Sequence, residues 1–122
     1  MNRLVLAVAL VLLAGCQTPG SPQGCGNVQI DWVDFIQIGS TQYVAGSGSF
    51  GTLQERDLGP EAARVKFKVA GNVCDPSYHP KDGDAAFLDP GTAIYEVNGH
   101  PKTEVLAARH DGQIVAYVAK SP

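Results

Sequence analysis

The side chains best suited to chemistry gather in one segment, from Cys74 to Asp84. Asp75, His79, Asp82 and Asp84 lie within ten positions of one another. A histidine close to a carboxylate is a common general base, and oxygen-rich loops are the usual ligands of calcium. This segment therefore raises an enzyme hypothesis: a small hydrolase or a metal-dependent enzyme, with His79 as the first candidate base.

Other features of the sequence weaken the enzyme hypothesis. Asp82-Gly83-Asp84 lacks the spacing of an EF-hand loop, and aspartates in turns commonly bond nearby backbone amides instead. His100 and His110 lie in or beside expected turns, and no serine lies in a G-x-S-x-G elbow. The sequence therefore predicts no catalytic residue, no metal site and no cofactor. The enzyme is kept as the alternative.

A glycine-rich stretch, residues 46–51, matches the G-x-G-x-x-G pattern of dinucleotide-binding loops. That function requires a helix directly after the glycines, inside a βαβ unit. Here Gly59-Pro60 follows soon afterwards, and the rest of the chain has the alternation of strands. We expect an inter-strand loop rather than a nucleotide site.

The N-terminus has the organisation of a secretory signal. Arg3 precedes an apolar run, residues 4–13, which is well short of the ~20 residues that span a bilayer. The run ends in Leu13-Ala14-Gly15-Cys16, which resembles the lipobox of bacterial lipoproteins at all four positions. The alternatives are a plain secretory signal with a chance cysteine, or an uncleaved buried helix.

The resemblance implies that a diacylglyceryl group is attached to the Cys16 sulfur and that residues 1–15 are removed as a signal-peptide helix. It also implies acylation of the new N-terminus, with chains such as palmitate. Two or more acyl chains hold a protein stably on a membrane. We therefore expect an extracytoplasmic protein, anchored through Cys16 to the bacterial cell membrane or the outer membrane.

Residues 16–24 read as a flexible tether rich in proline and glycine, and residues 25–122 as a single domain. Beyond Cys16 the tether reaches at most ~29 Å at ~3.6 Å per residue. Removal of Arg3 with the signal leaves 8 basic residues of 9 against 12 acidic ones, so the net charge changes from −3 to −4. This acidity argues against a nucleic-acid partner.

With Cys16 carrying lipid, Cys25 and Cys74 remain in an oxidising compartment, where pairing is the default. We predict a disulfide between them. Two free thiols or a two-cysteine metal site are the alternatives, although no CxxC or HxxxH pattern supports a metal.

Alternation and turn residues predict an all-β fold of about seven short strands, arranged as a small antiparallel sandwich or barrel. Gly39-Ser40 and Asp111-Gly112 are expected hairpin turns, and residues 60–63 are expected to form one helical turn. In residues 64–69, Val65, Phe67 and Val69 should face inward and the basic residues outward. The expected strands are residues 28–38, 41–45, 64–69, 85–88, 92–97, 104–109 and 113–118.

Residues 82–99 resemble a group of uncharacterised bacterial secreted or lipid-anchored domains. The shared run is Asp82-Gly83-Asp84-Ala85-Ala86, the apolar pair Phe87-Leu88, then Pro90-Gly91-Thr92 and a strand with Tyr95 and Val97. The likeness extends from Trp32 to Tyr117 and supports the boundaries of the domain. No activity or ligand is attached to that group.

Together these features predict a lipid-anchored envelope protein that acts as a non-catalytic binding or structural module. Its partner would be an envelope protein or a glycan. Such a module should expose an apolar or aromatic patch, for which Tyr43, Tyr78 and Tyr95 are the candidates.

Overall fold

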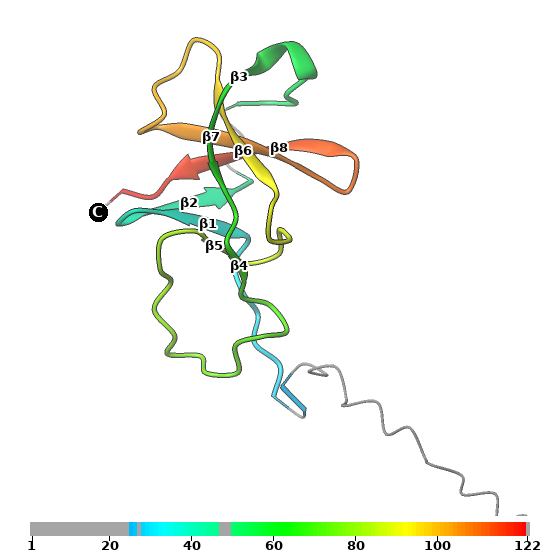
Figure 1. The fold of residues 1–122 in the computed structure, drawn as a ribbon, viewed down its shortest axis with the longest axis vertical. Coiled ribbons are helices and arrows are strands. Elements are labelled where there is room, and N and C mark those ends of the chain that lie inside the picture. Colours follow the sequence, from blue (N-terminus) through cyan, green and yellow to red (C-terminus); the bar gives the residue numbers. More distant parts are fainter. Residues whose placement is uncertain (1–24, 27, 47–49, 122) are drawn as a thin grey trace, which may run out of the picture.

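The computed structural model describes residues 25–26, 28–46 and 50–121, and all statements about structure concern these residues. The lipobox, Cys16 and the tether lie outside them. The described part of the chain is built from eight strands and one short 3-10 turn (Figure 1). These are β1 (Phe35–Ile38), β2 (Thr41–Ala45), η1 (Glu55–Asp57), β3 (Leu58–Arg64), β4 (Phe67–Lys68), β5 (Asp84–Ala85), β6 (Ala93–Val97), β7 (Val105–His110) and β8 (Gln113–Ala119).

The eight strands form a single sheet in the order β3-β6-β7-β8-β2-β1-β5-β4, curled into a half-barrel. The all-β prediction is confirmed, and the curled sheet corresponds to the barrel rather than the sandwich. The two outermost strands, β3 and β4, are consecutive in the chain and separated only by Val65 and Lys66. One bent stretch of chain therefore runs along both edges of the sheet and holds it curled. In the described ranges, no helix has the length and apolar character needed to cross a membrane.

The hairpin turns lie where the sequence places them. Gly39 has a φ of 58° between β1 and β2, and Asp111 and Gly112 have φ of 51° and 75° between β7 and β8. Two successive positive φ values are those of a type I′ turn, whose twist matches that of the strands it joins. The turn sets the β7–β8 register, in which His110 lies opposite Gln113 and Leu106 opposite Tyr117.

The concave face of the sheet carries the main core. Side chains from six strands meet there, and strands that are not neighbours can share a cluster only on the inside of the curl. Tyr117 is fully buried at its centre, and its hydroxyl donates a hydrogen bond to Asp34 Oδ1 at 3.2 Å. The buried residues of this inner cluster are Ile36, Tyr43, Val65, Ala85, Leu88, Ile94, Leu106, Ala108 and Tyr117.

Two smaller clusters lie on the opposite, convex face. One joins Phe35, Val69 and Ala86, with Trp32 and Tyr78 packed against them. The other joins Val97, Val105 and Ala107, and it is covered by Phe50, Leu53 and Leu58. Phe35 and Ile36 are both buried, which explains the imperfect alternation of residues 28–38: both faces of β1 are covered.

Two local predictions around β3 are wrong. Residues 60–63 form part of β3 rather than a helical turn, because they pair with β6 through two register shifts. Phe67 is 38% exposed, although Val65 and Val69 are buried. The amides of Lys66 and Phe67 both donate to the carbonyl oxygen of Gly83, an irregularity that reverses the side-chain phase. As a result Val65 joins the inner cluster and Val69 a convex one.

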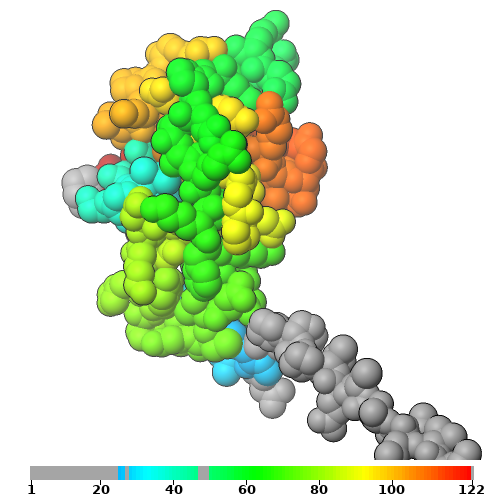
Figure 2. Space-filling model, in the orientation of Figure 1, coloured from blue at the N-terminus to red at the C-terminus, as the bar shows by residue number. Residues whose placement is uncertain are grey.

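The expected strand over residues 85–88 is also shorter than predicted. Only Asp84 and Ala85 are in strand conformation, although Ala86 and Leu88 are buried without it. The loop between Val69 and Gly83 fills the end of the molecule where the described chain begins (Figure 2). The 3-10 turn η1 lies at the other end of the long axis (Figure 1).

Candidate functional site

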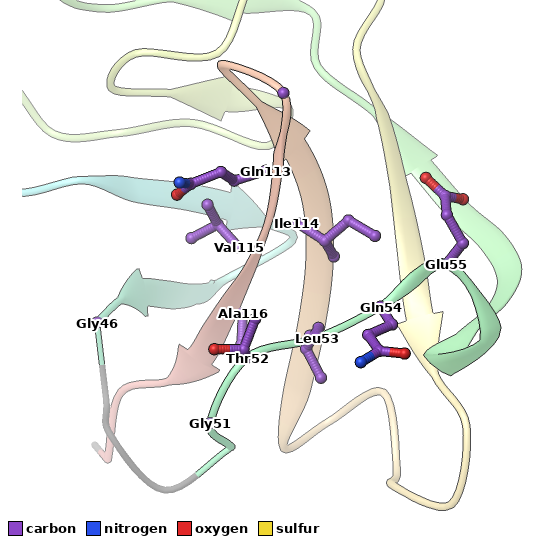
Figure 3. Close-up of a pocket in the computed structure, with 11 residues that line it drawn as sticks. Gly46, Gly51, Thr52, Leu53, Gln54, Glu55, Gln113, Ile114, Val115 and Ala116 are labelled. Carbon is purple, nitrogen blue, oxygen red and sulfur yellow. The ribbon is translucent and has the colours of Figure 1, made fainter.

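A groove of about 610 Å³ lies beside the first half of β8. Residues 51–55 form one side and residues 113–116 of β8 the other, and Gly46, at the end of β2, lies nearby (Figure 3). We call it the β8 groove. Its volume is within the range of sites that bind small molecules or short peptide segments.

Polar contacts fix the 51–55 side of the groove. The side-chain amide of Asn98 donates to the carbonyl oxygens of Arg56 at 3.0 Å and Leu58 at 3.2 Å, and its backbone amide donates to the carbonyl of Asp57 at 2.8 Å. The Asp57 carboxylate in turn accepts from the amide of Gln54 at 2.7 Å. Three bonds from Asn98 thus hold η1 against the end of β6.

Close packing supports the same wall. A Cβ at Gly59 would lie 3.0 Å from Asn98 Oδ1 and 3.3 Å from the Glu96 carbonyl oxygen, so β3 can approach Asn98 this closely only with glycine. The rings of Phe50 and His100 meet edge to face at 4.9 Å between centroids. These contacts hold the 51–55 side of the groove in place.

One ion pair neutralises the single ionisable side chain among the described lining residues. Arg109 donates from Nε to Glu55 Oε1 at 2.9 Å and makes a second bond to Oε2. Arg109 also donates to the Tyr95 hydroxyl at 3.0 Å and lies 5.2 Å from the centre of that ring. The hydrogen bonds from Arg109 lower the pKa of Glu55, so this carboxylate stays ionised and paired.

The chemistry available in the groove is that of binding. The other described lining residues are glycines, Thr52, Gln54, Gln113 and aliphatic side chains. Within this set there is no histidine or cysteine, and the carboxylate of Glu55 is already bound by Arg109. A nucleophile next to an available base, which covalent catalysis requires, is not present among them.

The backbone of β8 adds donors and acceptors to the groove. In the two-residue hairpin His110 and Gln113 form the closing pair, and alternate residues of β8 then bond to β7. Ile114 and Ala116 therefore direct their N–H and C=O groups away from β7. Farther along, β8 pairs with β2, with Val118 opposite Val44 and Tyr117 opposite Ala45, the last residue of β2.

A second hollow, of about 500 Å³, meets the β8 groove at Gly46. It is predominantly aliphatic, and Val33, which lines it, is 60% exposed. The other lining residues are Gln42, Val44, Ala45, Gly46, Val118, Ala119 and Lys120. Among the described residues, the convex face therefore has a partly exposed apolar strip between its two buried clusters.

The predicted disulfide is present: Cys25 and Cys74 are bonded, with a sequence separation of 49. It ties the first described residue of the domain to the loop that follows β4. The prediction for Cys16 falls outside the described residues. So do Ser47, Gly48 and Ser49 of the glycine-rich stretch, whose end residues Gly46 and Gly51 line the β8 groove.

The residues of the enzyme hypothesis serve structural roles. Asp84, 5% exposed, accepts hydrogen bonds from the Tyr78 hydroxyl at 2.6 Å and the Lys81 amide at 2.8 Å. The bond between the Tyr78 hydroxyl and Asp84 raises the pKa of Tyr78 to about 12. Asp82 accepts from the Gly39 amide at 2.7 Å and from Lys66 at 3.0 Å. Asp75 accepts from the amide and hydroxyl of Ser77.

His79 is exposed, and within the described chain it forms no hydrogen bond or ion pair. The described residues also contain no group of three or more His, Cys, Asp or Glu side chains placed to hold a metal ion. The loop from Cys74 to Asp84 therefore gives the hydrolase or metal-enzyme alternative no geometric support.

The Asp-Gly-Asp part of the shared run acts as a structural joint. Asp82 connects the β1–β2 turn to Lys66, and the Gly83 amide donates to the Gln37 carbonyl at 2.8 Å. Gly83 has a φ of 90°, and a Cβ there would lie 2.5 Å from Lys66 Cδ. This explains the residue types of the run by packing alone.

The expected surface patch of tyrosines is wrong for Tyr43. It is only 6% exposed, and its hydroxyl donates to the Lys102 carbonyl at 2.8 Å. Tyr78 and Tyr95 are half-buried and engaged with Asp84 and Arg109. The basic residues expected to face outward do so or are half-buried, and each has an acidic partner: Arg64 with Glu61, Lys66 with Asp82 and Lys68 with Asp89.

Comparisons of the chain with protein-family models, with curated proteins and with solved structures give no match. The site is therefore interpreted from its own geometry. Sequence reasoning missed the β8 groove, although the Asp111-Gly112 turn that sets its β8 side was recognised. Asn98 was recognised only as the end of a strand, and nothing local indicates that Arg109 pairs with Glu55, 54 positions away.

Proposed function

We propose that this chain is a lipid-anchored, extracytoplasmic envelope protein whose β8 groove binds a partner without transforming it. The anchor is the acylated Cys16, and residues 16–24 tether residues 25–122 to the bacterial cell membrane or the outer membrane. The observation that carries the binding role is the described lining of the groove: its backbone and side-chain amide groups can bond a ligand, and the one carboxylate among these described residues is neutralised by Arg109.

Two observations support the proposed location. The Cys25–Cys74 disulfide is the pairing expected in an oxidising compartment. The described chain also begins at the end of the molecule opposite η1, so a tether that leads to this point leaves the η1 end directed away from the membrane (Figure 1). A partner in the envelope could then reach the groove.

The anchor is tested by fractionation. Cells producing the full chain should hold it in the membrane fraction, and the Cys16→Ser variant, which cannot form the thioether, should not carry lipid. Equal acylation and equal membrane retention of both proteins would refute the anchor.

The binding role is tested by photo-crosslinking in intact cells. A photoreactive amino acid replaces Gln54, which lines the groove, or Glu104, an exposed residue just before β7. A saturable adduct at position 54, absent from position 104 and competed by excess unmodified protein, supports the proposal. Absence of any adduct at position 54 would contradict it.

A further inference from the structure

One pair of residues at the end of β6 is chemically labile. Asn98 is followed by Gly99, and the backbone nitrogen of a glycine can attack the side-chain amide before it because glycine has no side chain to block the approach. We infer that Asn98 is a site of spontaneous deamidation that acts as a one-way latch: the intact amide holds η1 against β6, and its conversion after an opening prevents the contact from reforming. This inference does not depend on the proposed binding role of the β8 groove.

The reaction needs only water. The Gly99 nitrogen forms a bond to Cγ of Asn98 and loses its proton, and the Cγ–Nδ2 bond breaks, so that Nδ2 leaves as ammonia with that proton. Water then opens the five-membered succinimide at either of its two carbonyl groups, which gives aspartate or isoaspartate. Asn98 is exposed in the structure, so water reaches it.

The fold protects the intact residue by fixing its side chain. Nδ2 of Asn98 donates to the carbonyl oxygens of Arg56 at 3.0 Å and Leu58 at 3.2 Å. The backbone amide of Asn98 donates to the carbonyl of Asp57 at 2.8 Å. A Cβ at Gly59 would lie 3.0 Å from Oδ1, so β3 packs closely against the other polar atom of the amide. These contacts hold the side chain in one orientation as long as η1 stays on β6.

The turn that follows β6 keeps the attacking nitrogen away. The amide of His100 donates to the carbonyl of Val97 at 3.0 Å, and Gly99 has a φ of 82°. Among the described residues other than glycine, only Asp111 has a positive φ, so the φ of Asn98 is negative. These values are those of a type II turn, whose first central residue has a ψ of about +120°. This ψ directs the Gly99 nitrogen away from the Asn98 side chain, so cyclisation requires the turn to open.

The product cannot restore the contact. Aspartate has two side-chain oxygen atoms and no N–H, so in either orientation an acceptor faces the carbonyl oxygens of Arg56 and Leu58. Isoaspartate in addition lengthens the main chain by one methylene group directly after β6. Acceptors left facing one another without a donor cost more than a missing bond. Conversion should therefore release η1, and with it the 51–55 side of the β8 groove.

Protection by the fold is measured by mass spectrometry of the oxidised protein during incubation at mildly alkaline pH. Conversion of the amide to a carboxylate changes the mass of the peptide that contains Asn98. Its rate is compared between the folded protein and the same chain in urea with the disulfide reduced. Conversion should be at least about tenfold slower in the folded protein, because it proceeds only through an open form. Asn72, whose side chain also donates to a backbone carbonyl, precedes β-branched Val73 and should stay intact in both states.

Two variants test whether the opening of η1 sets the rate. Leu53→Ala removes an apolar side chain that packs on the convex cluster of Val97, two positions before η1. It should speed conversion at Asn98 at least about threefold, because η1 opens more often. Val73→Ala removes an apolar side chain from the other convex cluster. It is the matched control and should leave the rate of conversion unchanged.

The Asn98→Asp variant tests the consequence of conversion. Its η1 amides should exchange hydrogen at least about tenfold faster than those of the unchanged protein, whereas the amides of β7 and β8 should keep their protection and show that the variant is folded. Protein deamidated by incubation should show the same pattern. At a pH low enough to protonate the new carboxyl, the variant regains one donor and the difference in η1 exchange should shrink. The Asn98→Ala variant has no such group and should show no recovery.

Each of four results would overturn the inference. Equal conversion in the folded protein and in urea would mean that the contacts do not protect Asn98. An Asn98 that stays intact in urea would mean that the pair is not labile. An unchanged rate in Leu53→Ala would separate conversion from the opening of η1. Unchanged η1 exchange in Asn98→Asp would mean that the product still holds η1 on β6.

Discussion

Removal of the Cys25–Cys74 disulfide should destabilise the domain strongly. The bridge closes a loop with a sequence separation of 49. The chain-entropy relation for a loop of this length gives about 4 kcal/mol at 25 °C, and removal of native disulfides from small secreted domains typically costs 2–5 kcal/mol. Because domains of this size are stable by only about 5–15 kcal/mol, the loss is a large fraction of the total.

The structure indicates where the destabilisation acts. The bridge holds the segment before β1 against the loop after β4, and Trp32, Val73 and Tyr78 from these two parts pack on the same convex cluster. Without the bridge both parts must be ordered by contacts between Trp32 and Tyr78, whose rings meet edge to face at 6.5 Å, and their neighbours. The free energy of unfolding should therefore fall by 2–4 kcal/mol, which lowers Tm by roughly 10–30 °C.

The assay is urea unfolding of the Cys25→Ala/Cys74→Ala double variant beside the oxidised protein. Two controls accompany it: the oxidised protein treated with a phosphine reductant, and the Cys25→Ala single variant. All three forms without the bridge should unfold at similar urea concentrations. A double variant within about 1 kcal/mol of the oxidised protein would refute the reasoning, because the loop would then not constrain the unfolded chain as proposed.

Three further substitutions test individual parts of the structure. Tyr78→Phe should lower the free energy of unfolding by about 2 kcal/mol, because the buried side chain of Asp84 loses the hydrogen bond that the Tyr78 hydroxyl donates to it. Chemical denaturation measures this change, and an unchanged midpoint would contradict it. Asn98→Ala should lower the free energy of unfolding by about 1 kcal/mol and speed hydrogen exchange of the η1 amides. Unchanged exchange of these amides would mean that Asn98 does not hold the 51–55 side of the groove. Burial raises the pKa of Asp34, and the Tyr117 hydrogen bond and His110 oppose this effect. The folded protein therefore binds a proton at Asp34 more tightly than the unfolded chain does, so the free energy of unfolding falls as the pH rises above about 3.9. Asp34→Asn keeps an acceptor for Tyr117 and cannot ionise; its Tm should exceed that of the unchanged protein at pH 7 and approach it at pH 3, and the opposite order at pH 7 would refute this account.

Features of the fold that depend on local sequence were predictable. The Asp111-Gly112 turn has the two positive φ values that its residue types favour, and it fixes the β7–β8 register. The Gly39-Ser40 turn was identified for the same kind of reason. The disulfide followed from counting cysteines once Cys16 was assigned to lipid.

Features that depend on distant pairing were not predictable. Residues 60–63 have the proline and alanines of a helix start, but pairing with β6 makes them a strand. Tyr43 looks like a surface aromatic until the curl of the sheet places it in the inner cluster. Phe67 fails the alternation because Lys66 and Phe67 share one acceptor, Gly83, which is distant in the chain.

The β8 groove belongs to the same unpredictable class. Its two sides are about 60 residues apart in the chain and meet only because β8 and the loop after β2 share the convex face. The ion pair of Arg109 with Glu55 and the bonds from Asn98 to Arg56 and Leu58 each span more than 35 positions. The acidic loop had the stronger local pattern, but its carboxylates are used in turns and joints.

Mass spectrometry of the mature N-terminus in producing cells tests the central claim most directly. The account predicts a chain that begins at Cys16, lacks residues 1–15, and carries a diacylglyceryl group on the Cys16 sulfur together with the Cys25–Cys74 disulfide. A chain that retains Met1, or one with an unmodified Cys16 thiol, would contradict it.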